Sequence, residues 1–180
     1  ADGQLVPISL VVTPMLSDRG VMGAVLVFRD IRHQKQVERE RLHTEGLLRR
    51  IQAALSELAK NAQVYGGSLQ DAVQAVTRVS AECLHTERVS IWFFTDDRSS
   101  IQCADLYQLA TRKHSQGLAL NATDYPKYFQ ELETERVVVA DNAQADPRTN
   151  EFTATYLAPL GITSMLDVPI RSEGRMVGVI

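Results

Sequence analysis

The stretch Leu157–Val179, LAPLGITSMLDVPIRSEGRMVGV, decides the fold class of this chain. A Pro and a Gly near its start end a short helical segment, after which TSMLDVPI (residues 163–170) has the composition of a β-strand. Residues 172–175, SEGR, have turn composition, and the apolar run over residues 176–180 predicts a second strand. Two β-rich runs around a polar turn predict an antiparallel hairpin.

Upstream of that hairpin, the pattern alternates between helices and strands. Gly66-Gly67 interrupts a helix, and Ser68, with Asp71 three residues later, predicts a capped helix that runs to about His85. RVSIWFF and SIQCADLY then predict two antiparallel strands around a polar turn, the first buried on both faces. The other elements expected before residue 157 are a polar insertion (108–123), a short helix opened by Asp124 (124–132), a strand (137–139) and a second short helix (150–158).

The N-terminal third predicts a hairpin followed by a long helix. The apolar runs over residues 4–12 and 21–28 flank turn residues, and Asp30 is a suitable N-cap for a helix from Arg32 to about Gln63. Within that helix an apolar seam steps by three and four residues: Leu48, Ile51, Leu55, Leu58, Ala62 and Tyr65. Two interpretations stay open, an amphipathic helix on its own domain and a self-associating signalling helix.

Composition excludes several classes of protein. The chain has 180 residues, 44% hydrophobic and 23% charged, which predicts one globular domain plus a remainder. A net charge of -3 argues against a nucleic-acid binder, and two cysteines cannot form a disulfide framework. The longest apolar run, Val21–Phe28, is too short to span a bilayer, so we expect no membrane contact in this stretch and a cytoplasmic location. Motifs for phosphate loops, metalloproteases and serine hydrolases are absent, so we expect no enzyme here.

The hairpin at residues 157–179 resembles the signature of the GAF domain, in which a Gly introduces a strand that ends in a D-x-P-I bend before a G-x-x-x-G strand. ERVSIWFF (87–94), ADPRTNEF (145–152) and the pair Tyr156-Leu157 also match the first strand and the pocket-side loop of that family. The resemblance implies an α+β fold with a mostly antiparallel sheet flanked by helices. It places a GAF domain at residues 66–180, without its last strand end and closing helix, and both ends of the chain suggest part of a longer protein.

The first residues resemble the last two strands of a PAS domain, with Asp30-Ile31-Arg32 where that family has D-I-T. The chain is therefore divided into PAS strands at 1–31, a signalling or coiled-coil helix at 32–65, and the GAF domain. Bacterial proteins with this arrangement carry an output domain in the same chain, such as a histidine kinase, slightly favoured, or a diguanylate cyclase.

The GAF resemblance also supplies a candidate ligand pocket, but no catalytic or metal-binding residue. Its residues are Trp92, Cys103, Tyr107, His114, Tyr125, Tyr128, Phe129, Arg148 and Asp167. Alternatives remain open for most of them: His114 as an exposed or hydrogen-bonding side chain, Cys103 as an inert buried thiol, the aromatic residues as core, and Arg148 as an ion-pair partner of Asp146 or Asp167. No haem, bilin or cyclic-nucleotide motif is found, so the cofactor is unknown.

Three functions are compared on this basis. The first is a sensory module that binds an unknown small ligand or a partner and signals through a homodimer of the 48–65 helix to the output domain. The second is a ligand-free dimerisation scaffold. The third, a methionine sulfoxide reductase, needs clustered cysteines, and only Cys103 is suitably placed.

Overall fold

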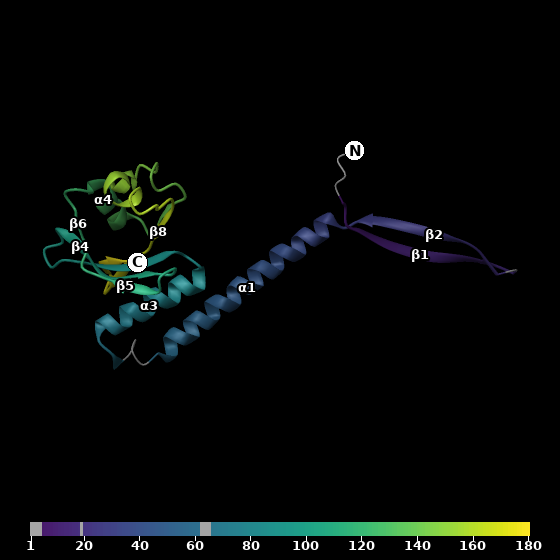
Figure 1. The fold of residues 1–180 in the computed structure, drawn as a ribbon, viewed down its shortest axis with the longest axis horizontal. Helices are drawn as coiled ribbons and strands as arrows, with labels where there is room; N and C mark the ends of the chain where they lie inside the picture. Colours follow the sequence, from purple (N-terminus) through teal and green to yellow (C-terminus); the bar gives the residue numbers. More distant parts are fainter. Residues whose placement is uncertain (1–4, 19, 62–65) are drawn as a thin grey trace. The chain divides into compact units, whose positions relative to one another are not determined.

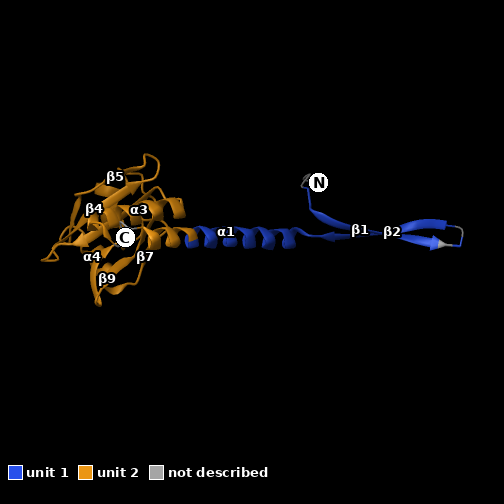
Figure 2. Ribbon diagram, turned by 90° about the horizontal axis from the view of Figure 1, so that it is seen from below, with its two compact units in different colours: residues 1–52 blue, residues 53–180 orange. Residues whose placement is uncertain are grey.

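The computed structural model describes residues 5–18, 20–61 and 66–180 (Figure 1). It separates into two compact units, residues 1–52 and 53–180 (Figure 2). The predicted seam residues Ala62 and Tyr65 lie outside the described residues.

The first unit contains a hairpin and most of a long helix. Strands β1 (Ile8–Ser17) and β2 (Gly20–Asp30) pair antiparallel, as the sequence predicts, and both are longer than expected. The Asp30 carboxylate accepts the backbone N–H of Arg32 at 2.9 Å, which caps helix α1 (Arg32–Lys60). Along β2 every side chain is exposed, so the hairpin buries neither of its faces within this unit.

The seam residues of α1 differ in how exposed they are. Leu48 and Leu55 are 54% and 61% exposed, whereas Ile51 and Leu58 are half-buried. In the second unit, Glu57 near the end of α1 forms an ion pair with Arg78 at 2.8 Å. The end of the helix therefore contacts α3 of its own unit through Glu57, while the side chain of Leu55 stays exposed.

The second unit is built on an antiparallel sheet of six strands. Its order is β5-β4-β3-β10-β9, and β6 also pairs with β4. A separate two-stranded ladder joins β7 to β8. The strands are β3 (Arg88–Phe94), β4 (Ser100–Gln108), β5 (Lys113–Ser115), β6 (Ala119–Asn121), β7 (Val138–Ala140), β8 (Met165–Asp167), β9 (Pro169–Ser172) and β10 (Arg175–Val179). This arrangement confirms the predicted fold class.

Helix α3 (Leu69–Leu84) covers one face of the sheet (Figure 1). Ser68 and Asp71 form the predicted capping box at its start, and His85 ends it in a left-handed conformation. The amide of Gln70 donates to the carbonyl of Ala104, which fixes the helix against β4.

A second layer covers the other face of the sheet (Figure 1) and encloses the larger apolar core. It consists of helix α4 (Pro126–Thr134), the 3-10 turn η1 (Asn150–Phe152) and the π-helical turn η2 (Thr153–Leu157). Phe152, Leu132 and Leu157 from this layer are completely buried against sheet residues such as Trp92 and Val179. Ring contacts between Phe152 and Tyr128, 4.6 Å between centroids, join η1 to α4.

Three expectations about this layer and the insertion need correction. Asp124 does not open α4, because Tyr125 is the N-cap, and the Glu151 carboxylate accepts the free N–H groups of Lys127 and Tyr128 instead. The segment 150–158 forms 3-10 and π turns rather than an α-helix. The insertion 108–123, expected to be a polar stretch, contributes the short strands β5 and β6 to the sheet.

Gly178 sets how closely β10 approaches β3. A Cβ at this position would overlap the carbonyl oxygen of Trp92 and crowd the ring of Phe93. The register places Gly178 opposite Phe93 and Val179 opposite Trp92. Glycine is needed at position 178 because the backbone of β3 occupies the space that a side chain of β10 would fill.

Candidate functional site

A cavity of 860 Å³ lies in the second unit, between the sheet and the η1–η2 layer. Four aromatic side chains line its inner part: Trp92 from β3, Tyr128 from α4, Phe152 from η1 and Tyr156 from η2. We call this region the aromatic part of the cavity. Because these rigid rings present flat apolar surfaces, the cavity favours flat apolar ligands over flexible ones.

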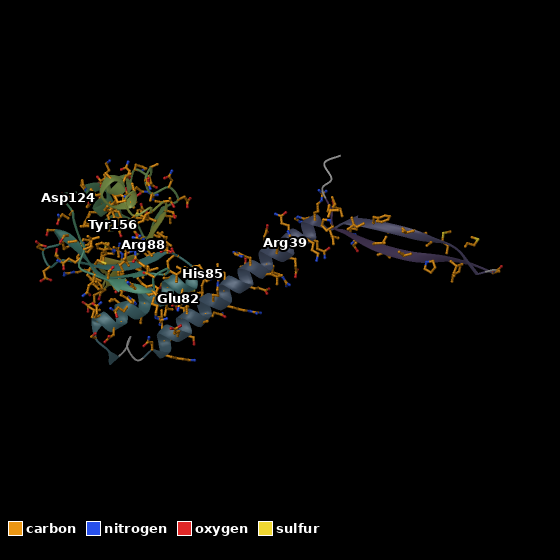
Figure 3. All side chains as sticks on the ribbon, in the orientation of Figure 1. Arg39, Glu82, His85, Arg88, Asp124 and Tyr156 are labelled. Atoms are coloured by element: carbon orange, nitrogen blue, oxygen red, sulfur yellow. The ribbon has the colours of Figure 1, made fainter. Side chains whose placement is uncertain are left out.

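The other part of the cavity borders the first half of β3. Strand β10 pairs with β3 only at Phe93 and Trp92, so residues 88–91 have β4 on one side and, among the described residues, no strand on the other. The lining there includes His85, Glu87 and Arg88. Figure 3 labels Arg88 on the sheet and Tyr156 in the layer above it.

Asp167 is the charged residue of the aromatic part. It ends β8, and its Oδ2 accepts the hydroxyl hydrogen of Tyr128 at 2.7 Å. Burial raises the pKa of Asp167 from 3.8 to about 6, although the Tyr128 hydrogen bond acts in the opposite direction. Burial, together with the neighbouring Asp167 charge, also raises the pKa of Tyr128 well above its ordinary value, so this hydroxyl stays a donor.

A second, smaller cavity of 220 Å³ shares Arg88, Trp92 and Tyr156 with the first. Cys103 lines it from β4. Burial first, and then the charge of Asp105, raises the pKa of the Cys103 thiol to about 11. A protonated thiol is a poor nucleophile, so Cys103 is an apolar wall residue at neutral pH.

The nine candidate residues fall into separate places. Trp92, Tyr128 and Asp167 line the larger cavity, and Trp92 and Cys103 line the smaller one. Tyr125 and Phe129 line neither cavity. Tyr125 stacks on Phe152 with centroids 4.4 Å apart, and Phe129 meets the edge of Phe94, so both act as core packing.

Tyr107 and His114 also line neither cavity, because they belong to a cluster under α3. Their rings lie 4.8 Å apart, and His114 Nδ1 is 2.8 Å from Oδ2 of Asp105. The same carboxylate oxygen accepts the hydroxyl of Thr77 from α3 at 2.5 Å. This group holds β4, β5 and α3 together rather than facing a ligand.

Arg148 is occupied by its own loop. Its guanidinium pairs with Asp146 at 2.7 Å and donates to the carbonyl of Val139. Hydrogen bonds from Arg148 lower the pKa of Asp146 to about 2. Arg148 does not line either cavity, and Asp167 is not its partner.

Sequence reasoning missed Phe152, Tyr156 and Asp105. Tyr156 reaches the cavity from a π-helical turn, and the residues 153–157 show no local pattern that predicts such a turn. Phe152 stood inside the matching block 145–152, which was the available signal for it. Asp105 was placed only as an alternating position in the strand of Cys103, with no partner of its own.

Two features are absent from the described part of the chain. It contains no group of three or more His, Cys, Asp or Glu side chains arranged to hold a metal ion. None of its helices combines the length and the apolar character needed to cross a membrane.

The family model described as the GAF domain matches residues 68–180. This range contains both cavities and begins at the N-cap of α3. No curated protein sequence matches the chain.

Several solved structures share the fold. The chromophore-binding domain of Stigmatella aurantiaca bacteriophytochrome is 15% identical with a TM-score of 0.57, over 99% of this chain and 61% of that one, so this chain spans less than two thirds of it. A phycoerythrobilin-bound GAF domain from a cyanobacterial phytochrome is 21% identical with a TM-score of 0.57, over 72% and 79% of the two chains. Residues 122 to 287 of a methyl-accepting chemotaxis protein are 18% identical with a TM-score of 0.53, over 73% and 79%.

Proposed function

The chain belongs to the GAF domain family, and on that basis we propose that it is a sensory, regulatory part of a cytoplasmic signalling protein. The GAF domain binds a small ligand in the 860 Å³ cavity. The observation that carries this proposal is a cavity of ligand size whose aromatic walls are Trp92, Tyr128, Phe152 and Tyr156.

Similar folds support a ligand-binding role. One is a phycoerythrobilin-bound GAF domain and another is a chromophore-binding domain. A third belongs to a chemotaxis protein. These likenesses make a sensory role for this chain more reasonable than catalysis, for which it offers no activated nucleophile at Cys103.

Signal transfer is assigned to the long helix. A ligand can shift the state of an output domain only if it binds one helix arrangement better than another. We assign residues 1–31 to the end of a PAS domain, because a two-stranded hairpin with exposed faces is marginal without further strands. The output domain in the same chain is a histidine kinase in preference to a diguanylate cyclase.

Ligand binding in the cavity is testable by thermal unfolding with a set of flat aromatic compounds. A compound present at 100 times its Kd should stabilise the native chain by about 2.7 kcal/mol. Leu160 lines both cavities and is 40% exposed, so Leu160→Trp should narrow them without disturbing the core. The variant should keep its melting temperature and lose the compound's stabilisation.

Two results would contradict ligand sensing. Stabilisation that is equal in the native chain and in Leu160→Trp would place binding outside the cavity. A set in which no compound stabilises the native chain would favour the ligand-free scaffold.

The homodimer is assigned to the exposed face of α1 that carries Leu48 and Leu55. Because Leu55 is 61% exposed, Leu55→Asp should leave the melting temperature of the GAF domain within a few degrees of the native value. It should dissociate the dimer, since a charge in an apolar seam costs several kcal/mol. Sedimentation at several concentrations measures the change, and Ala53→Asp, exposed on the opposite side of the helix, is the matched control. A chain that stays monomeric before any substitution would refute this interface.

A further inference from the structure

The charges around the larger cavity are unevenly placed. Its titratable lining residues are His85, Glu87, Arg88, Tyr128, Tyr156 and Asp167. The first three lie at or before the start of β3, beside the strand edge described above. Asp167 alone brings a carboxylate to the aromatic part, beside Tyr128 and Tyr156.

The Asp167 carboxylate has unused capacity to accept hydrogen bonds. One donor, the Tyr128 hydroxyl, reaches Oδ2. Neither an ion pair to Asp167 nor a hydrogen bond to its Oδ1 occurs among the residues that the structure describes. Oδ1 is not sealed from the cavity either, because the side chain is only half-buried and lines the cavity wall. A carboxylate in low-dielectric surroundings that lacks a cation gains most from a ligand that supplies one.

We propose, on the basis of the function proposed above, that Asp167 selects the ligand and that the ligand is a flat aromatic cation. A positively charged N–H group of the ligand donates to Oδ1. The ring system lies among Trp92, Phe152 and Tyr156, whose faces attract cations as well as apolar surface. The same geometry disfavours a flat aromatic anion, which would face an uncompensated carboxylate.

Arg88 is the only Lys or Arg side chain in the lining, and its charge would favour the opposite preference. It forms no ion pair with a described residue, and it is close enough to lower the pKa of Tyr156 against the larger effect of burial. Arg88 is, however, half-exposed at the first residue of β3, where water and salt weaken its field. Asp167 lies beside Tyr128 in the aromatic part of the cavity and acts on the ligand at short range, so its attraction for a cation outweighs the repulsion from Arg88.

Two acridines of opposite charge test the proposal: 9-aminoacridine, a cation at neutral pH, and acridine-9-carboxylate, an anion. Binding to the full chain is measured by calorimetry at pH 7.5, with the melting temperature of each variant recorded. We expect the cation to bind at least about tenfold tighter than the anion, and Asp167→Asn to weaken the cation at least about tenfold. The Asn side chain keeps the acceptor for Tyr128, so the variant should fold.

Two further variants separate Asp167 from general charge effects. Glu133→Gln removes a negative charge from an exposed residue that lines neither cavity, and it should leave cation binding unchanged. Arg88→Gln should leave the cation unchanged or bind it slightly tighter.

The outcomes distinguish this inference from the proposed function. Tighter binding of the anion, equal losses in Asp167→Asn and Glu133→Gln, or no binding of 9-aminoacridine would each overturn the role of Asp167. In those cases the function still stands if another aromatic compound stabilises the native chain but not Leu160→Trp. If no compound does so, both fail.

Discussion

His114→Ala should lower the free energy of unfolding by about 3 kcal/mol, because it removes the ring that faces a buried carboxylate. Asp105 is 1% exposed, and Nδ1 of His114 lies within hydrogen-bond distance of its Oδ2, at 2.8 Å. Without that ring, Thr77 is the remaining partner of Oδ2, and Oδ1 has no partner among the residues that the structure describes. Urea unfolding followed by circular dichroism measures the loss.

Two further variants show whether the loss in His114→Ala comes from the Asp105 carboxylate. His43→Ala, on an exposed part of α1, should change stability by less than about 0.5 kcal/mol. In His114→Ala/Asp105→Asn, part of the loss should be recovered, because a neutral amide is less costly to bury than a charge. If His114→Ala is as mild as His43→Ala, the pair does not stabilise the contact between α3 and the sheet.

The parts of the fold that sequence predicts well are those specified by neighbouring residues. The capping box of Ser68 and Asp71 needs two residues three apart, and it starts α3 as expected. Strand β3 was predicted with its observed bounds, Arg88–Phe94, because its β-branched and aromatic residues stand between polar turns. Local chemistry decides these elements.

The elements that were missed depend on distant partners. Strands β5 and β6 have three residues each, too few for an alternating pattern, and they exist because β4 offers an edge to both. Asp105 is buried by Thr77, 28 residues earlier, and by His114 across a strand pair. Neither relation leaves a trace in the residues next to Asp105.

The candidate site shows the same division. Resemblance placed Trp92, Tyr128 and Asp167 in a pocket, and these three line the larger cavity. The resemblance also included Arg148, which the structure pairs with Asp146 two residues away, the open alternative of an ion pair. A motif gives positions in a loop, but which side chains turn inward depends on packing between η1, η2 and α4.

Asp167→Asn should stabilise the chain at pH 7.5, although it removes a charge from a half-buried residue that hydrogen-bonds Tyr128. Burial raises the pKa of Asp167 from 3.8 to about 6, so the native state holds this proton more tightly than the unfolded chain does. Each pKa unit corresponds to about 1.4 kcal/mol, so ionised Asp167 costs the native state about 3 kcal/mol above pH 6. The cost falls as the pH drops through 6 and is gone below pH 4, where both states are protonated. Urea unfolding should therefore show Asp167→Asn about 2–3 kcal/mol more stable at pH 7.5 and nearly equal to the native chain at pH 4.

The cause of this effect decides how the site is understood. Asn offers Tyr128 the same oxygen acceptor, so the comparison isolates the charge from the hydrogen bond. If Asp167→Asn is instead less stable at pH 7.5, the charged hydrogen bond from Tyr128 outweighs the desolvation of the carboxylate. If it is more stable, a carboxylate that destabilises the folded domain lines the 860 Å³ cavity, and a bound cation would remove that cost. Ligand binding and stability then report the same electrostatic penalty. The ionised Asp167 carboxylate lowers the free energy of unfolding of the ligand-free domain, and a bound cation restores it by compensating that charge.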